Sequence, residues 1–242
     1  MFSKERIVWG LVMSAAVIFI ALINDFWVTF VVFGVLLYFA FDEAKKLFEV
    51  PKASVIFVFA AFILGSLSKE PLAFGALLFL LVVGYLVYIK AKSFKESLPY
   101  LYPVVPIFAL WQLYLDKGMF ALFWLIFIVV ICDSGAYFVG KLIGATPFSP
   151  TSPNKTREGV IGGIVCAMIF GTLFGLFEYS FSLSLVCSVV VAIFAVIGDL
   201  LESYFKRKSG VKDSSTLIPG HGGVLDRIDA LIIAVFAMLA LV

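Results

Sequence analysis

The chain has 242 residues, of which 63% are hydrophobic and 14% are charged. Soluble domains are about half apolar and a quarter charged, so this composition excludes an ordinary soluble domain and favours a membrane protein. The formal net charge of +2 is too small to indicate a nucleic-acid partner, and we expect none. The three cysteines lie inside apolar runs without CxxC spacing, so we expect neither disulfides nor a zinc site.

Apolar runs recur along the whole chain. They cover approximately residues 7–23, 26–41, 53–67, 72–89, 99–115, 119–140, 160–177, 181–200 and 224–242. A helix that crosses a bilayer needs about 20 residues. The sequence therefore predicts an all-α polytopic membrane protein with about nine transmembrane helices. No small-residue cleavage site follows the first run, so we interpret it as a retained helix and not as a signal peptide.

The basic residues predict an orientation for these helices. Fifteen of the 18 Lys and Arg residues fall in segments that would be cytoplasmic if the N-terminus is cytoplasmic. The opposite loops contain only Lys69 and Lys117. Cytoplasmic loops of membrane proteins carry an excess of basic residues. We therefore expect a cytoplasmic N-terminus and a C-terminus on the outside.

Two of the expected cytoplasmic loops, 141–159 and 205–223, are long. The first contains three prolines and the second is basic and rich in Gly and Ser. This composition argues against helix, and long ordered loops often carry function. We see no internal repeat and no soluble domain. We expect one integral membrane unit, with N-terminal helices in residues 1–98 and the catalytic region in residues 99–242.

Four carboxylates stand at the expected cytoplasmic ends of three helices: Asp133, Asp199, Asp226 and Asp229. Charged residues in membrane spans are costly and indicate function by default. Asp226 and Asp229 are three residues apart and share a helix face. Converging carboxylates form a hard-oxygen site that suits Mg²⁺. The alternative is a set of ordinary interfacial charges that pair with nearby Lys or Arg.

A basic cluster precedes the last apolar run. Lys206, Arg207, Lys208 and Lys212 come first, and the stretch 219–223 (PGHGG) then leads into a helix N-terminus. Glycines let backbone N–H groups approach an anion, and a helix N-terminus favours phosphate. This order predicts a phosphate pocket beside the magnesium site. A topology signal is the alternative for the cluster, and a structural hydrogen bond is an equal alternative for His221.

The stretch from Ser203 to Asp229 resembles the signature of the phosphatidate cytidylyltransferases, also called CDP-diacylglycerol synthases. Every fixed position of that signature is present: Ser203, Lys206, Arg207, Lys212, Asp213, His221, Gly222, Gly223, Asp226, Arg227 and Asp229. The stretches 132–137 and 198–203 are also similar to the family. The loop 152–163 is similar as well, but Asn154 stands where a lysine is usual and Arg157 where an apolar residue is common. The first half of the chain matches only as a set of apolar helices.

The resemblance implies a reaction in which CTP and phosphatidic acid give CDP-diacylglycerol and pyrophosphate, with Mg²⁺ as the cofactor. The attacking group would be the anionic phosphate oxygen of the lipid, so no protein nucleophile is needed. The enzyme must bring two polyanions together and stabilise the charge that develops on the transferred group. The resemblance also suggests a homodimer, a second cation and, in a bacterium, the cytoplasmic membrane with the active site facing the cytoplasm.

The resemblance assigns roles to the residues of the motifs. The metal ligands would be Asp199, Asp226 and Asp229, with Asp133 as a further or supporting ligand. The catalytic set would be Lys206, Arg207, Lys212, Asp213, His221 and Arg227. The substrate-binding set would be Ser152, Lys155, Thr156, Glu158, Ser203, Gly222 and Gly223.

Other interpretations are weaker. A CTP-dependent polyprenol or phytol kinase would share a nucleotide site but has no reason to carry the full signature. An ion-coupled transporter would place carboxylates near the midplane and show repeated halves. The stretch 135–142 nearly matches a P-loop, but Leu142 replaces the required Ser or Thr and the stretch falls at a predicted helix end.

Overall fold

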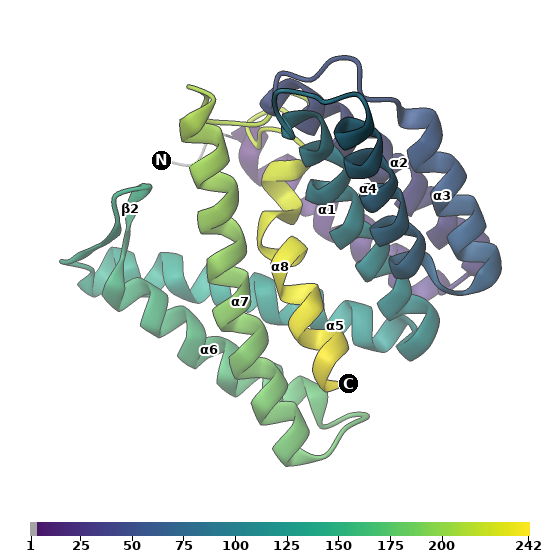
Figure 1. The fold of residues 1–242 in the computed structure, drawn as a ribbon. Coiled ribbons are helices and arrows are strands. Elements are labelled where there is room, and N and C mark those ends of the chain that lie inside the picture. Colours follow the sequence, from purple (N-terminus) through teal and green to yellow (C-terminus); the bar gives the residue numbers. More distant parts are fainter. Residues whose placement is uncertain (1–3) are drawn as a thin grey trace. The chain divides into compact units, whose positions relative to one another are not determined.

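The computed structural model describes the backbone of residues 4–242 and the side chains of residues 8–242 (Figure 1). In chain order the elements are α1 (Lys4–Ile23), α2 (Phe26–Leu47), α3 (Val55–Ser68), α4 (Pro71–Tyr88), η1 (Lys95–Ser97), η2 (Tyr100–Val104), α5 (Val105–Ile143), β1 (Pro147–Ser149), β2 (Ser152–Thr156), α6 (Arg157–Gly175), α7 (Phe181–Lys208) and α8 (Leu225–Leu241). The side chains of Lys4 and Arg6, which contribute to the expected basic asymmetry, lie outside the described part.

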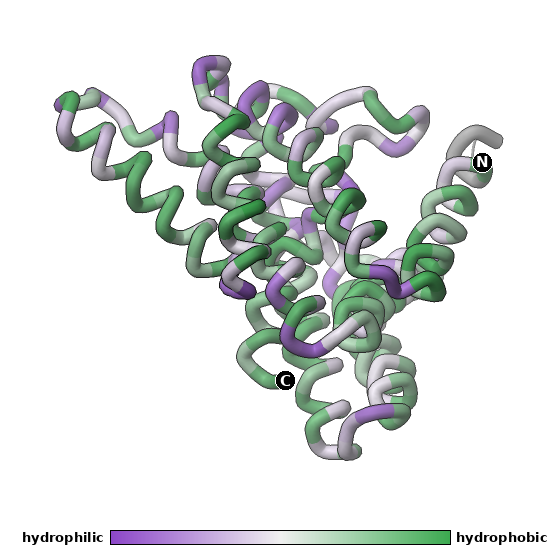
Figure 2. The backbone as a smooth tube through the Cα atoms, turned by 90° about the vertical axis from the view of Figure 1, so that its right-hand side faces the viewer, coloured by the Kyte–Doolittle hydropathy of each residue, from purple (hydrophilic) through white to green (hydrophobic). Residues whose placement is uncertain are grey.

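Each of the nine apolar runs corresponds to a helical segment. The fifth run covers η2 and the start of α5, and the sixth lies in the rest of α5, which is broken at Gly118, where φ is 78°. This left-handed conformation is accessible to glycine without strain. Most turns of the helices are hydrophobic, and hydrophilic residues gather at helix ends and in connecting segments (Figure 2).

By length and composition, five helical segments of the described chain can cross a membrane. They are Phe26–Leu47, Pro71–Tyr88, Lys95–Ile143, Arg157–Gly175 and Phe181–Lys208. Two further apolar helices, Val8–Ile23 and Val55–Ser68, are shorter. The protein is therefore an α-helical integral membrane protein, as the composition predicts.

The two long loops contain more regular structure than their composition suggested. In the first, Pro147 pairs with Thr156 and Ser149 with Ser152 in an antiparallel hairpin, and α6 begins already at Arg157. In the second, α7 continues to Lys208, so the basic cluster begins in the last helical turn. Basic side chains stabilise a helix C-terminus because they interact favourably with its dipole, which accounts for this extension.

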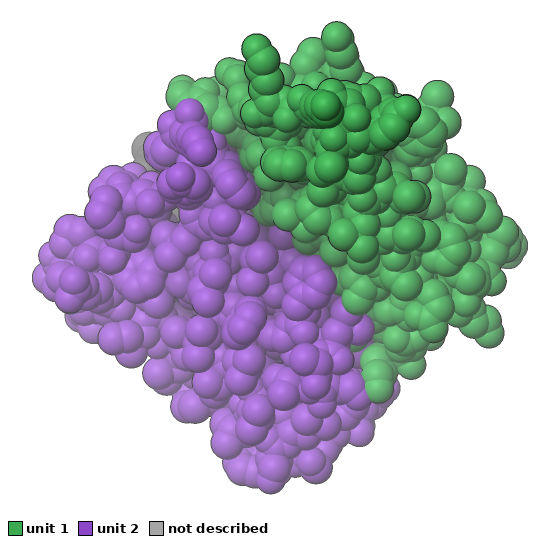
Figure 3. All heavy atoms as spheres, viewed as in Figure 1, with its two compact units in different colours: residues 1–119, 209–228 green, residues 120–208, 229–242 purple. Residues whose placement is uncertain are grey.

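The chain packs as two compact units (Figure 3). Unit 1 comprises residues 1–119 and 209–228, and unit 2 comprises residues 120–208 and 229–242. Unit 1 therefore joins the N-terminal helices to the segment between α7 and α8. The helix α8 begins in unit 1 and continues in unit 2.

An aromatic cluster around Trp111 forms the core of unit 1. The Trp111 side chain is fully buried, and its Nε1 donates a hydrogen bond to Ser66 Oγ at 2.9 Å. The rings of Phe33 and Phe62 have centroids 5.2 Å and 5.9 Å from that of Trp111. Helices α2, α3 and α5 meet at this indole, and α4 packs against α3.

Trp124 has the corresponding role in unit 2. It is fully buried, stacks on Tyr179 with a centroid distance of 5.1 Å, and donates from Nε1 to the carbonyl of Gly171 at 2.8 Å. These contacts hold α6 against the second half of α5. Helix α7 packs against the second half of α6, near the turn that joins the two helices (Figure 1).

Replacing Trp111 by Ala removes the indole around which unit 1 packs. We expect the free energy of unfolding in detergent to fall by about 3–5 kcal/mol, because the buried ring leaves a cavity. The matched control is Trp27→Ala, since Trp27 is 69% exposed. Thermal unfolding followed by intrinsic fluorescence measures both variants, and equal losses of stability would contradict the importance of the Trp111 core.

Candidate active site

Unit 2 contains a pocket of about 390 Å³, which we call the hairpin pocket. Its lining comes from the end of α5, from β2, from the start of α6 and from α7. The lining residues are Asp133, Ala136, Tyr137, Gly140, Lys141, Asn154, Lys155, Thr156, Val160 and Asp199. Four of the residues that the sequence assigned to the site, Asp133, Lys155, Thr156 and Asp199, therefore line one cavity.

Thr156 and Glu158, both from the expected substrate-binding set, shape the hairpin base. Thr156 Oγ1 caps α6 by accepting a hydrogen bond from Gly159 N at 3.1 Å. Glu158 Oε2 accepts from the backbone N–H groups of Ala145 and Thr146 at 3.1 Å and 3.2 Å. These bonds fix where β1 leaves α5, and β2 then carries Lys155 into the pocket. Ser152 lies at the hairpin turn, paired with Ser149.

Asp199 connects the hairpin to α7. Its Oδ2 forms an ion pair with Lys155 Nζ, and Ser203 Oγ, one helical turn later, donates to Oδ1 at 3.4 Å. The carboxylate of Asp199 thus has a positive charge on one oxygen and a hydroxyl on the other. The ion pair brings together the two motifs at residues 152–163 and 198–203.

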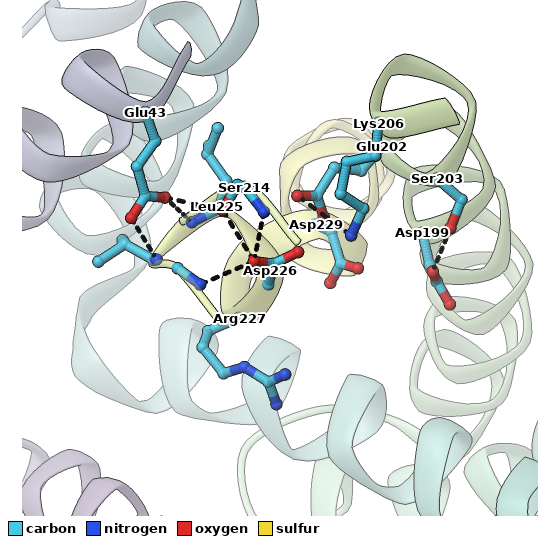
Figure 4. A network of polar contacts seen from close by, with 12 residues as sticks. Glu43, Asp199, Glu202, Ser203, Lys206, Ser214, Leu225, Asp226, Arg227 and Asp229 are labelled. Atoms are coloured by element: carbon cyan, nitrogen blue, oxygen red, sulfur yellow. Dashed lines mark hydrogen bonds and ion pairs between the residues drawn. The ribbon is translucent and has the colours of Figure 1, made fainter. Parts of the chain in front are cut away.

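A second ion pair lies about one turn further along α7, between Glu202 and Lys206. Glu202 is fully buried, and Lys206 Nζ lies 3.5 Å from its Oε1. The side chain of Asp229 of α8 lies beside Glu202 and Lys206 (Figure 4). The sequence analysis did not single out Glu202, although it lies in a stretch that resembles the family.

In unit 1, Asp226 closes the segment that precedes α8. Its Oδ2 accepts hydrogen bonds from Ser214 N at 2.8 Å, Ser214 Oγ at 2.8 Å and Gly223 N at 2.7 Å. Only 9% of Asp226 is exposed. Asp226 therefore holds both ends of the loop 214–223 at the first turn of α8.

The remaining signature residues of unit 1 lie in or beside this loop. Arg227 Nε donates to the carbonyl of His221 at 3.1 Å, and the Arg227 side chain is exposed. The His221 ring lies against α1, because a Cβ at Gly10 would be 3.7 Å from His221 Nε2. His221 Nδ1 is buried and has no hydrogen-bond partner among the described groups. Lys212 and Asp213 are exposed.

Several pocket residues were not assigned by the sequence analysis. Tyr137 stands in a stretch that resembles the family, and Lys141 Nζ lies 5.9 Å from the centre of its ring. Gly140 and Lys141 belong to the stretch that nearly matches a P-loop. That stretch is helical, so the P-loop interpretation is excluded, yet its last turn still borders the cavity.

The donor chemistry of the pocket suits a hard cation. Asp133 and Asp199 both line it, and carboxylate oxygens are the ligands that Mg²⁺ prefers. Among the described side chains, no group of three or more His, Cys, Asp or Glu is arranged to hold a metal. A cation at Asp199 would have to share or displace the ammonium group of Lys155.

Comparison with known proteins covers nearly the whole chain. Residues 4–242 match the model of the cytidylyltransferase family. A phosphatidate cytidylyltransferase of Helicobacter pylori is 37% identical over 243 residues, which cover 99% of this chain and 91% of the relative. A Haemophilus influenzae protein of the same name is 47% identical over 126 residues, covering 49% of this chain and 44% of the relative.

The full-length match extends through α1–α4, where the sequence alone offered only apolar runs. The chain belongs to the cytidylyltransferase family.

Proposed function

We propose that this protein is a phosphatidate cytidylyltransferase, which converts CTP and phosphatidate into CDP-diacylglycerol and pyrophosphate. The observation that carries the proposal is the hairpin pocket, where Lys155, Lys141 and two carboxylates border one cavity at the end of an apolar helix. The names of the full-length relatives supply the substrates.

The reaction needs no nucleophile from the protein. A phosphate oxygen of phosphatidate attacks the α-phosphorus of CTP, the new P–O–P bond forms, and the bond to the β-phosphate oxygen breaks. Pyrophosphate leaves with that electron pair. The protein must hold two polyanions in line and stabilise the charge that develops on the leaving group.

Basic side chains in both units have the chemistry for this task. Lys155 and Lys141 border the pocket in unit 2, and Lys206 and Arg207 lie at the end of α7. In unit 1, Lys212 and Arg227 are exposed beside the loop that carries His221. We assign these side chains to the phosphate groups of the substrates.

Magnesium would be held by Asp133 and Asp199, with Asp229 as a further ligand, and it would neutralise phosphate charge when bound. Asp226 was expected to be a metal ligand as well. The three hydrogen bonds to its Oδ2 support a different main role, which is to keep the loop 214–223 closed. Asp213 and Ser203 remain assigned to the site by the resemblance.

We further propose the topology and setting that the sequence predicts. The nine helical segments would span the membrane with the N-terminus in the cytoplasm and the C-terminus outside. In a bacterium, the site would face the cytoplasm from the cytoplasmic membrane, where CTP is available. A homodimer, a second cation and the absence of a nucleic-acid partner belong to the same proposal.

Purified protein with phosphatidate and CTP labelled on the α-phosphate tests the reaction. We expect label in the lipid extract and an equal amount of pyrophosphate, both dependent on Mg²⁺. Chelation of the metal should abolish both products. Label entering a lipid alcohol from the γ-phosphate of CTP would instead identify a kinase, and uptake into vesicles without pyrophosphate would identify a transporter.

Asp199→Asn removes the negative charge that pairs with Lys155 while keeping the side-chain size. We expect turnover to fall by about 100-fold, which is typical for loss of one preorganised electrostatic contact in an active site. The control is Asp116→Asn, because Asp116 is exposed beside the break in α5 and its carboxylate accepts from Gln112 Nε2 at 3.0 Å. Its activity should match the wild type. Unchanged turnover of Asp199→Asn would exclude Asp199 from the site.

A further inference from the structure

Glu43 is a buried acid that the proposed mechanism does not use. It lies near the end of α2, only 3% of the residue is exposed, and it belongs to unit 1. Burying a carboxylate is costly unless hydrogen bonds or an opposite charge compensate for the lost water. The groups that donate hydrogen bonds to the Glu43 carboxylate therefore show which part of the chain Glu43 holds in place.

Both oxygens of Glu43 accept hydrogen bonds from the segment 214–225. Oε1 accepts from Ser215 Oγ at 2.7 Å and from Val224 N at 2.9 Å. Oε2 accepts from Leu225 N at 2.8 Å and lies 3.0 Å from Ser214 Oγ. Figure 4 shows this carboxylate pointing from α2 at the chain around Ser214 and Leu225.

These contacts make Glu43 a helix cap supplied from a distant part of the chain. The first N–H groups of a helix have no partner within the helix, and a negative charge at that end is stabilising. Val224 and Leu225 stand at the start of α8, 181 and 182 residues after Glu43 in sequence. Glu43 thus fixes where α8 begins.

Glu43 also acts on the loop through a shared hydroxyl group. Ser214 Oγ lies 3.0 Å from Glu43 Oε2 and 2.8 Å from Asp226 Oδ2. A serine hydroxyl has one proton, so the two carboxylates share it. Glu43 and Asp226 therefore hold Ser214 at the beginning of the loop 214–223 together. At the other end, Asp226 accepts from Gly223 N and Glu43 accepts from Val224 N.

Gly223 packs closely against Glu43 and Ser214. A Cβ on Gly223 would lie 2.5 Å from each carboxylate oxygen of Glu43 and would also collide with Ser214 Oγ. A side chain at position 223 would therefore displace the Glu43 carboxylate and the Ser214 hydroxyl, and glycine permits the close approach of the loop to Glu43. This gives the Gly223 of the signature a structural reason that the sequence analysis did not find.

We propose that Glu43 is a positioning residue of the enzyme, which holds the loop 214–223 and the start of α8 in the conformation that receives the phosphates of the nucleotide. The inference rests on the proposed function, because that function assigns Lys212 and Arg227, beside this loop, to the phosphate groups of the substrates. Glu43 itself acts through the loop and does not contact the reacting atoms.

The test uses Glu43→Gln in the full-length protein. The new amide NH₂ cannot accept the two hydrogen bonds that one carboxylate oxygen now accepts. We expect KM for CTP to rise and kcat to fall, each by about tenfold, because hydrogen bonds to charged groups are worth about that factor or more. KM for phosphatidate should stay within about twofold of the wild type.

The matched control is Glu49→Gln. Glu49 pairs with Lys95 at 2.6 Å, and its side chain is 72% exposed. The same chemical change there should leave both KM values and kcat unchanged.

Hydrogen exchange separates positioning from general stability. In Glu43→Gln, the amides of Ser214, Val224 and Leu225 should exchange faster, while those of α6 and α7 keep their wild-type protection. Faster exchange throughout the protein, or unchanged exchange in the loop, would overturn the proposal. This measurement requires no turnover, so the anchoring of the loop is tested even if the protein transfers no cytidylyl group. If Glu43→Gln shows wild-type exchange in the loop and wild-type cytidylyl transfer, the positioning role of Glu43 is wrong while the proposed function stands.

Discussion

The structure depends on partners for carboxylates that are withdrawn from water at the ends of apolar helices. A buried charge without partners costs several kcal/mol, and removal of one partner leaves that cost uncompensated. Glu43 and Asp226 are compensated by hydroxyl and backbone N–H donors. Asp199 and Glu202 have ammonium groups close by, from Lys155 and Lys206. The contacts of Glu43, Asp226 and Asp199 each tie two segments together, and the candidate functional loops are fixed by these contacts.

The N-terminal half therefore contributes more than membrane anchoring. Without α2, the loop 214–223 would lose the carboxylate that caps α8 and holds Ser215. The Trp111 cluster supports this arrangement, because it packs α2 against α3 and α5 within the same unit. This dependence accounts for a family match that extends over residues 4–242 and not only over the motifs.

Much of the fold and of the site follows from the sequence, but the long-range contacts do not. Hydrophobicity predicts helices because every backbone group in a bilayer must be satisfied internally, and each apolar run is helical. Motif resemblance identified four residues of the hairpin pocket. Glu43 gave no signal, because it sits beside Asp42, Lys45 and Lys46 and reads as one more interfacial charge. The hairpin was missed because prolines at both strands indicate a loop, whereas Thr156 and Glu158 stabilise a turn there.

The ion pairs also bear on how such a site handles two anionic substrates. Lys155 and Lys206, which are at least partly withdrawn from water, each lie beside an acid, at Asp199 and Glu202. A lysine held in this way keeps its charge and its orientation, so a phosphate that arrives replaces one partner by another and need not order a mobile side chain. In the proposed mechanism, the acid that is released would be available to hold a cation. Pairing acids with bases in this way keeps the net charge of the site small, which agrees with a chain whose formal charge is only +2.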